Sequence, residues 1–294
     1  MNNFQENIWK EELRSEIIHA IVGTPEEKRD SFLKMGNFYQ NYAPPFLYKY
    51  YRSTPENISA IKNNKIWFSS PCNFNDVFDC DISVDEKDIF EWVLNNLNER
   101  KIKRNSTKWF QLKSKISQEI VTLQESLKLF KANMGITCLS ELDNSLLMWA
   151  HYAENHRGIC VEYNLLKMNS QSKLSAVPVI YSKNKVKFYP TESANINTES
   201  LRALIYSITS KSPEWDYERE WRIIQDSEAC GKSWNCEAKG ALLSIIKPNS
   251  IILGCKVDCT VERDMIEYCK SEKIPLYKMF KDEAYYCLNK KRIL

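Results

Sequence analysis

The sequence predicts an α+β protein with a mostly antiparallel β-sheet, and three observations support this class. Several short segments are rich in aromatic and β-branched residues and favour strands, such as residues 46–52 and 65–69. Other segments have helical periodicity, above all residues 85–131. The seven glycines lie at least nine positions apart, which excludes the glycine-rich nucleotide loops of many parallel α/β enzymes.

The 294-residue chain is long enough for one large domain or two ordinary ones, and we expect one domain with additions. Residues 1–43 are expected to form an N-terminal helical extension. Residues 44–294 are expected to form a single α+β domain with a helical insertion at about 85–133.

Charge and hydropathy limit the partners of the chain. The 41 basic and 38 acidic residues give a net charge of +3, which provides no global attraction to nucleic acid or membranes. No apolar run approaches the roughly 18 to 20 residues that span a bilayer, and the first residues lack the pattern of a secretion signal. We therefore expect a cytoplasmic protein that does not bind a membrane.

Capping residues mark the N-terminal helices. Residues 4–20 have an uneven apolar face, which predicts a first helix. At Thr24-Pro25-Glu26-Glu27, the threonine can cap a second helix, the proline suits its first turn, and Glu27 can reach back to the cap. Pro44-Pro45 cannot continue a helix, so the main domain should begin there.

The main domain is expected to alternate strands and helices between turn residues. The predicted strands are residues 46–52, 65–69, 136–140, 159–163, 177–181, 220–225, 241–246, 251–253 and 276–280. The predicted helices are residues 55–64, 144–153 and 261–270, with two or three more in 85–131. Residues 72–79 are rich in Asn and Asp and predict an ordered loop.

Common metal and cofactor motifs are absent. His-Glu-x-x-His does not occur, and His151 and His156 lie five positions apart, about 140° around a helix, so they would not share a face. There is no Cys-x-x-Cys, and Cys255 and Cys259 have no second ligand pair at a familiar spacing. We expect no metal, and ten reduced cysteines that mostly lie in the core because most fall in apolar runs.

Five ordered motifs resemble a bacterial family known as domain of unknown function 2971. The motifs are Leu47-Tyr48-Lys49-Tyr50, Ile66-Trp67-Phe68-Ser69-Ser70-Pro71-x-Asn73-Phe74-Asn75-Asp76, Met148-Trp149-Ala-His151-Tyr152-Ala, His156-x-Gly158-Ile159-Cys160 and Tyr217-Glu218-x-Glu220-Trp221-Arg222. The resemblance covers about residues 46 to 255 and departs from the family at Val77, where proline is more frequent. The family carries no function, so the mechanism must come from the residues.

A second resemblance concerns the order of elements. A strand, a short capped helix and a strand, followed much later by a glutamate at a strand start, are similar to the ADP-ribosyltransferase fold, most of all its DNA- and RNA-modifying toxins. This resemblance covers about three short segments. It implies a split, mostly antiparallel β-sheet whose cleft takes NAD as a substrate without Rossmann glycines and without a metal.

The same resemblance implies roles for individual residues. The implied NAD-binding residues of the first two strands are Tyr50 or Arg52, Ser69 and Ser70. Glu220 would be catalytic, and Glu218-x-Glu220 resembles the paired-glutamate motif of the arginine-modifying branch. His151 and Tyr152 follow Trp149 and are the candidates for a shelf against nicotinamide.

The chemistry explains why a carboxylate would be needed. Breaking the nicotinamide–ribose bond builds positive charge on the sugar carbon, as in glycosidases. A fixed carboxylate that faces this charge stabilises the transition state more than the ground state. On an extended strand Glu218, Glu220 and Arg222 would share one face, so that one carboxylate holds the ribose and the other orients the attacking group.

Each of these candidates also has a structural interpretation. Glu218, Glu220 and Arg222 are equally consistent with ion pairs on a solvated face. Residues 69–71 suit the end of a strand, and Arg52 suits a local cap or ion pair.

Three further groups complete the candidates. Asn75, Asp76 and Asp79 are candidates for binding a cation or substrate, although a self-bonded turn explains them more simply. His151 suits a hydrogen-bonded core histidine. Residues 100–115 hold seven basic residues, no acid and two aromatics, which suits either a solvated helix face or a nucleic-acid contact. The basic residues proposed for that contact are Lys101, Lys103 and Arg104.

The leading expectation is an effector, in a toxin or phage-defence system, that transfers ADP-ribose from NAD to a nucleic acid or protein, or hydrolyses NAD. The alternative is a non-catalytic module that binds nucleic acid or a protein partner through the basic insertion. A third interpretation is a metal-free nuclease that uses His151 and nearby carboxylates. The sequence does not specify the acceptor, the oligomeric state or the role of the N-terminal helices.

Overall fold

The computed structural model describes residues 3–96, 102–171, 174–188, 198–231 and 234–294. It confirms a mixed α+β fold with a mostly antiparallel open sheet. The chain divides into two compact units. Unit 1 comprises residues 1–42, 71–133 and 180–213, and unit 2 comprises residues 43–70, 134–179 and 214–294. The division into an extension and one domain with an insertion stays a prediction.

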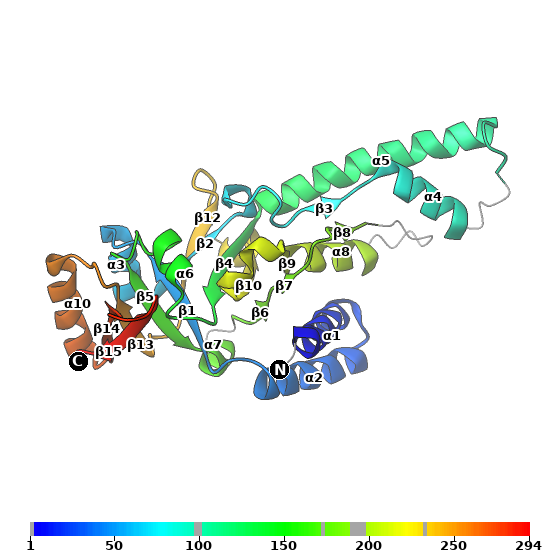
Figure 1. Cartoon of the computed structure of the whole chain (residues 1–294). Coiled ribbons are helices and arrows are strands. Elements are labelled where there is room, and N and C mark those ends of the chain that lie inside the picture. The colour runs from blue at the N-terminus through cyan, green and yellow to red at the C-terminus, as the bar shows by residue number, and fades with distance from the viewer. Residues whose placement is uncertain (1–2, 97–101, 172–173, 189–197, 232–233) are drawn as a thin grey trace. The chain divides into compact units, whose positions relative to one another are not determined.

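Unit 1 is mainly helical (Figure 1). Its helices are α1 Asn3–Val22, α2 Pro25–Asn41, the 3-10 helix η1 Pro71–Asn73, α4 Glu86–Asn96, α5 Thr107–Ala132 and α8 Thr198–Ile208. Its short strands are β3 Ile82–Ser83, β7 Ile180–Tyr181, β8 Val186–Lys187 and β9 Ser210–Lys211. They form two separate parallel pairs, β3 with β8 and β7 with β9.

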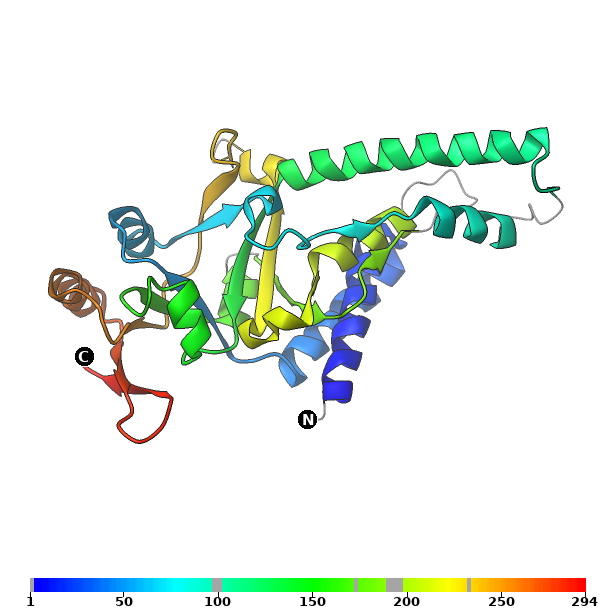
Figure 2. The same ribbon diagram turned by 45° about the horizontal axis from the view of Figure 1, so that its top comes forward.

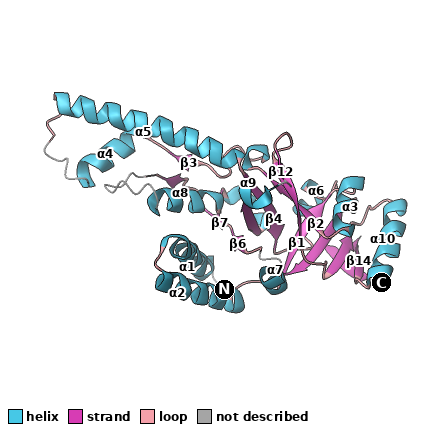
Figure 3. Cartoon of the chain, turned by 180° about the vertical axis from the view of Figure 1, so that it is seen from behind, coloured by secondary structure: helices cyan, strands magenta, loops and turns pink. Residues whose placement is uncertain are grey.

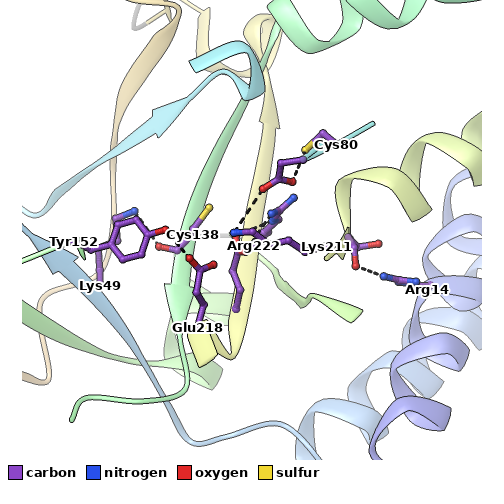
Figure 4. Close-up of polar contacts among 11 residues, drawn as sticks. Arg14, Lys49, Cys80, Cys138, Tyr152, Lys211, Glu218 and Arg222 are labelled. Atoms are coloured by element: carbon purple, nitrogen blue, oxygen red, sulfur yellow. Dashed lines mark hydrogen bonds and ion pairs between the residues drawn. The ribbon is translucent and has the colours of Figure 1, made fainter. Parts of the chain in front are cut away.

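The predicted capping box at the start of α2 is confirmed. Thr24 Oγ1 accepts a hydrogen bond from Glu27 N at 3.3 Å, and Glu27 Oε2 accepts one from Thr24 N at 2.7 Å. Helix α2 ends at Asn41, directly before the two prolines at positions 44 and 45. Within unit 1, Arg14 of α1 is buried and donates to the Thr209 carbonyl and, at 3.1 Å, to Ser210 Oγ, so α1 is fixed to β9 (Figure 4).

The helical structure predicted for residues 85–131 is confirmed in the described residues as α4 and α5, and the two helices lie side by side (Figure 2). Their shared core contains Ile89, Phe90 and Ile116, with Trp109 packed against it. Trp109 meets Phe90 edge to face at a centroid distance of 5.3 Å. The tryptophan of the basic run therefore serves the packing of the insertion.

Unit 2 holds an eleven-stranded sheet, drawn in magenta in Figure 3. The strands along its main path are β11 Trp234–Asn235, β12 Gly240–Ser244, β2 Lys65–Ser69, β4 Met134–Ser140, β1 Phe46–Tyr51, β5 Ile159–Asn164, β13 Ser250–Leu253, β14 Leu276–Lys281 and β15 Leu288–Arg292. Two more strands extend the sheet from β4: β10 Glu220–Asp226 pairs with β4, and β6 Ala176–Pro178 pairs with β10. Within this sheet, as far as its residues are described, β13 and β14 are the only parallel neighbours, because helix α10 connects them as a crossover.

The helices of unit 2 are α3 Pro55–Lys62, α6 Leu146–His151, α7 Leu165–Gln171, η3 Pro213–Glu218, α9 Ser227–Cys230 and α10 Cys259–Glu272. Helix α6 packs through Met148 and Trp149 on the sheet face that carries Tyr50, Cys160 and Ile252. A side chain on Gly158 would overlap the carbonyl oxygen of Tyr51, so only glycine fits where β5 begins beside the end of β1.

Two sequence predictions need correction. The strand predicted at residues 177–181 is divided into β6 and β7, which pair with different strands. Strand β15 was not predicted, because its exposed residues Asn289 to Arg292 lack the apolar alternation of a half-buried strand.

Three whole-chain properties complete the description of the fold. No helix in the described part of the chain is long and apolar enough to cross a membrane. Among the described residues no group of three or more His, Cys, Asp or Glu side chains could hold a metal ion. All ten cysteines are free thiols, but four of them are buried and four are exposed, so the expectation of mostly buried thiols was wrong.

Candidate functional site

Strand β4 of unit 2 joins the segments that carry most of the predicted site. Ser140 of β4 lies opposite Glu220 of β10 on one side and opposite Tyr48 of β1 on the other. Residues opposite one another on neighbouring strands point to the same face of the sheet. Tyr48, Ser140 and Glu220 therefore form one row across three strands.

The sheet forks on one edge of β4. Strand β1 pairs with β4 only at Ser140, and β2 pairs with it only at Ile136. Between these two points the carbonyl oxygen of Cys138 accepts a hydrogen bond from Lys49 Nζ of β1 at 2.9 Å. Lys49 thus replaces a strand partner where β1 and β2 separate.

Glu220 and Arg222 form a buried ion pair along β10. Arg222 Nε donates to Glu220 Oε1 at 2.8 Å, and Arg222 Nη2 donates to Glu220 Oε2 at 3.1 Å. The Glu220 residue is 3% exposed and Arg222 is 0% exposed. The interpretation of this pair as part of a solvated face is therefore wrong.

Glu218 is also buried, but it does not lie on the strand. It ends the 3-10 helix η3, and Arg219 follows with a left-handed φ of 46°, so the alternation expected along residues 218–222 begins only at Glu220. Tyr152 Oη donates to Glu218 Oε1 at 2.5 Å, and Ser140 Oγ donates to the Glu218 carbonyl at 2.6 Å. Figure 4 shows Tyr152, Glu218 and Arg222.

Glu141 fixes the turn between Glu218 and Glu220. Its Oε1 accepts a hydrogen bond from Trp221 Nε1 at 2.7 Å, and its Oε2 lies 3.4 Å from Arg219 Nε. The Glu141 backbone N–H also donates to the Arg219 carbonyl at 3.1 Å. These bonds to both neighbours of Glu220 hold the residues of the strained turn in place.

Aromatic side chains of α6 and η3 lie beside this cluster. Tyr50 is mostly buried, donates to the Leu142 carbonyl at 2.7 Å and meets Trp149 edge to face, which makes it a core residue. His151 is exposed, so the expectation of a core histidine was wrong. Its ring lies 6.2 Å from the ring of Tyr217 and 6.4 Å from that of Tyr152.

The predicted hydroxyls and arginine of the first two strands lie farther along the sheet. Ser69 is opposite Ile136, four positions from Ser140, or about 13 Å at the usual rise per residue of a strand. Ser70 is fully buried, and its backbone N–H donates to the Lys239 carbonyl at 2.8 Å. Arg52 is exposed just beyond the end of β1, and its carbonyl accepts from Asn57 Nδ2 at 3.0 Å.

The predicted substrate-binding residues belong to unit 1. Asp76 Oδ1 accepts a hydrogen bond from Phe78 N at 2.9 Å, which is the self-bonded turn considered for Asn75 and Asp76. Lys103 and Arg104 are exposed before helix α5. Lys101 lies outside the described residues.

Lys49 is the site residue that the sequence did not single out. It is half-buried, and burial lowers the pKa of its ammonium group, while the Cys138 thiol and the Glu220 carboxylate act in the opposite direction. In the motif Leu47-Tyr48-Lys49-Tyr50, Lys49 lies between two tyrosines of a predicted strand, where a lysine ordinarily faces water. Only the pairing of β1 with β4 reveals its partner.

Unit 2 is therefore a mixed α+β unit with buried carboxylates beside a fork in its sheet. Residues 148–223 match the model of a family described as protein of unknown function (DUF2971). The matched range contains Tyr152, Glu218, Glu220 and Arg222 and supports the family resemblance, whereas the motifs at 47–50 and 66–76 lie outside it. Neither a curated protein nor a solved structure matches the chain.

Proposed function

We propose that this chain transfers ADP-ribose from NAD to a macromolecule, or hydrolyses NAD, with Glu218 and Glu220 as the catalytic carboxylates. The observation that carries the proposal is that both carboxylates are buried at the start of β10 and oriented by hydrogen-bond donors, Tyr152 for Glu218 and Arg222 for Glu220. Oriented charges act strongly where water is excluded.

In the proposed reaction the bond between the ribose carbon and nicotinamide breaks, and its electron pair leaves with nicotinamide. Glu220 faces the positive charge that develops on the sugar carbon. Glu218 orients the acceptor, or water in the hydrolysis, which forms the new bond to that carbon and releases its proton to solvent. The two bonds from Arg222 fix the Glu220 carboxylate but also offset part of its charge.

The residues that the resemblance assigns to NAD binding do not converge on Glu220. Strands β1 and β2 separate on the edge of β4, with Arg52 at the end of β1 and Ser69 on β2. These residues do not meet at Glu220, and Ser69 lies about 13 Å along β4 from the Glu220 row.

The test is consumption of NAD labelled in its adenylate half, with the protein alone and with cell extract. Removal of one group that stabilises charge in a transition state typically lowers the rate about 100- to 1,000-fold. Glu220→Gln is expected to lower the rate of NAD consumption about 100-fold, at the lower end of this range, because Arg222 already offsets part of the Glu220 charge. Glu218→Gln is expected to reduce transfer more than hydrolysis if Glu218 orients the acceptor. Rates must be divided by the folded fraction of each variant.

Glu228→Gln is the matched control, because Glu228 is exposed on the short helix that follows β10. Full NAD turnover in the Glu220→Gln protein, or no turnover in the unmodified protein with any extract, would end this proposal.

The exposed His151 beside Tyr152 and Tyr217 favours a nuclease as the second candidate. Metal-independent nucleic-acid cleavage that is lost in His151→Gln would replace NAD chemistry by that function.

A further inference from the structure

A hairpin at the edge of the unit 2 sheet presents two exposed tyrosines. Residues 282–287 connect β14 to β15, and we call β14, β15 and this connection the tyrosine hairpin. Tyr285 is 76% exposed and Tyr286 is 101% exposed. Among the described residues neither ring contacts another ring. The connection, drawn in red, extends beyond its two strands in Figure 2.

The connection is an ordered turn. Asp282 Oδ1 accepts hydrogen bonds from the backbone N–H groups of Ala284 at 2.8 Å and Tyr285 at 2.9 Å, and Oδ2 accepts from Asn289 Nδ2 at 2.7 Å. These bonds lower the pKa of the Asp282 carboxyl, the Ala284 bond most. The turn therefore fixes the backbone at Tyr285, and less backbone conformational entropy would be lost when a partner covers the exposed rings.

Basic side chains lie along both strands of the hairpin, from Lys281 beside the turn to Arg292 at the far end of β15. Lys290 and Lys278 already pair with Asp143 at 2.5 Å and with Glu262 at 2.7 Å. Three exposed basic residues have no acidic side-chain partner among the described residues, and they are Lys281, Lys291 and Arg292. The Lys291 ammonium lies 5.1 Å from the centre of the Phe280 ring, and Arg292 Nε donates to the Leu294 carbonyl at 2.7 Å. The acids nearby in sequence are Asp282, whose oxygens bind the turn, and the exposed Glu283.

Protection of the sheet edge explains only part of this arrangement. Charged side chains on an edge strand prevent pairing with other strands, and this accounts for Lys291 and Arg292. It does not account for two exposed aromatic rings on an ordered turn. Basic groups beside accessible aromatic rings are the features that bind single-stranded nucleic acid, by ion pairing with phosphates and stacking on bases.

We propose that the tyrosine hairpin binds single-stranded nucleic acid, with bases stacked on Tyr285 and Tyr286 and phosphates held by Lys281, Lys291 and Arg292. This surface differs from the basic insertion in unit 1, and the proposal does not depend on NAD chemistry. Binding is measured without NAD, so a failure here leaves the proposed activity untouched.

The experiment is fluorescence anisotropy of a labelled oligothymidylate and a labelled oligouridylate, titrated with the full chain at several salt concentrations. Tyr285→Ala with Tyr286→Ala is expected to weaken binding about 10-fold or more, whereas the Tyr→Phe pair keeps the rings and the affinity. Lys291→Gln with Arg292→Gln should reduce the slope of log affinity against log salt by about 1.4, since each phosphate contact contributes about 0.7 for a single strand.

The matched charge control is Lys65→Gln with Lys270→Gln, two exposed lysines of unit 2 outside the hairpin, which should not change the affinity. Three outcomes overturn the proposal. One is the absence of salt-sensitive binding in the unmodified protein. Another is loss of binding only in Lys103→Gln with Arg104→Gln, which assigns the contact to the insertion. The last is equal competition by polyglutamate, which indicates an acidic protein partner.

Discussion

Glu220 and Arg222 lie two residues apart on one face of β10, and both oxygens of the glutamate accept hydrogen bonds from the arginine in a buried environment. Glu220→Gln leaves the buried Arg222 without the negative charge of this partner, and loss of one member of a buried pair is expected to lower the free energy of unfolding by about 3 kcal/mol. Denaturant titration measures the change. On a solvated face the same substitution would be nearly neutral, so unchanged stability would show that the pair is weaker than its geometry implies.

The coupling between these two residues gives a separate prediction. Arg222→Gln is expected to destabilise the protein by a similar amount to Glu220→Gln, because it leaves the carboxylate buried without the guanidinium. In the double variant the losses should not add, with a coupling energy of at least about 1 kcal/mol for residues in contact. Glu228→Gln should stay within about 0.5 kcal/mol of the unmodified protein. Additive losses for the pair would contradict direct coupling.

Tyr152→Phe tests the other carboxylate. The change removes the phenol that donates to Glu218 at 2.5 Å and keeps the ring. A hydrogen bond to a charged group contributes about 1.5 to 3 kcal/mol, so the substitution should lower the free energy of unfolding by an amount in that range. Tyr285→Phe is the control, because Tyr285 is exposed and its hydroxyl has no partner in the described part of the chain. An equal effect of both substitutions would rule out a special role for the Tyr152–Glu218 bond.

Local signals predicted much of the fold. The capping box at Thr24 and the strands near residues 46–52, 65–69 and 159–163 are confirmed, because caps and apolar strand patterns depend on nearby residues. The fork at β4 could not be predicted, since strand pairing is decided by contacts that are distant in sequence. The departure of Glu218 from the strand follows from the left-handed Arg219, a conformation that the residue type does not indicate.

The burial of Glu220 and Arg222 also depends on contacts that are distant in sequence, so local patterns could not predict it. Alternation correctly placed Glu220 and Arg222 on one side of a strand, but it could not decide whether that side faces water. Helix α6 packs beside this region and brings Tyr152 to Glu218. Lys49 was overlooked for the same reason, because its partner is a carbonyl of a strand about ninety positions later.

The cysteines should react in distinct classes. Cys72, Cys236, Cys259 and Cys287 are exposed and should react rapidly with a thiol reagent, while buried thiols such as Cys269, whose pKa burial raises to about 12, should react only on opening of the structure. Unfolding without reductant should make all ten thiols titratable. A total of six or fewer, in protein purified without oxidation, would indicate disulfides.

His156 should show a depressed pKa in the folded protein. Burial lowers the pKa of its imidazole, and the positive charge of Lys256 lowers it further. The chain has three histidines, so NMR signals of the imidazole protons can be assigned with one His→Gln variant each. One signal should titrate below the ordinary value of about 6.5 and disappear in His156→Gln. Lys256→Gln should move its midpoint upward.

The same shift gives a pH dependence of stability. A base whose pKa is depressed in the folded state binds protons more readily in the unfolded state. Protonation of His156 should therefore lower the free energy of unfolding as the pH falls through about 6.5, the ordinary pKa of histidine. The decrease should end once the pH lies below the pKa of His156 in the folded state. His156→Gln is expected to remove this part of the pH dependence in denaturant titrations, while His19→Gln, at an exposed position of α1, should retain it. Identical pH profiles for the His156→Gln and unmodified proteins would show that the imidazole keeps its ordinary pKa.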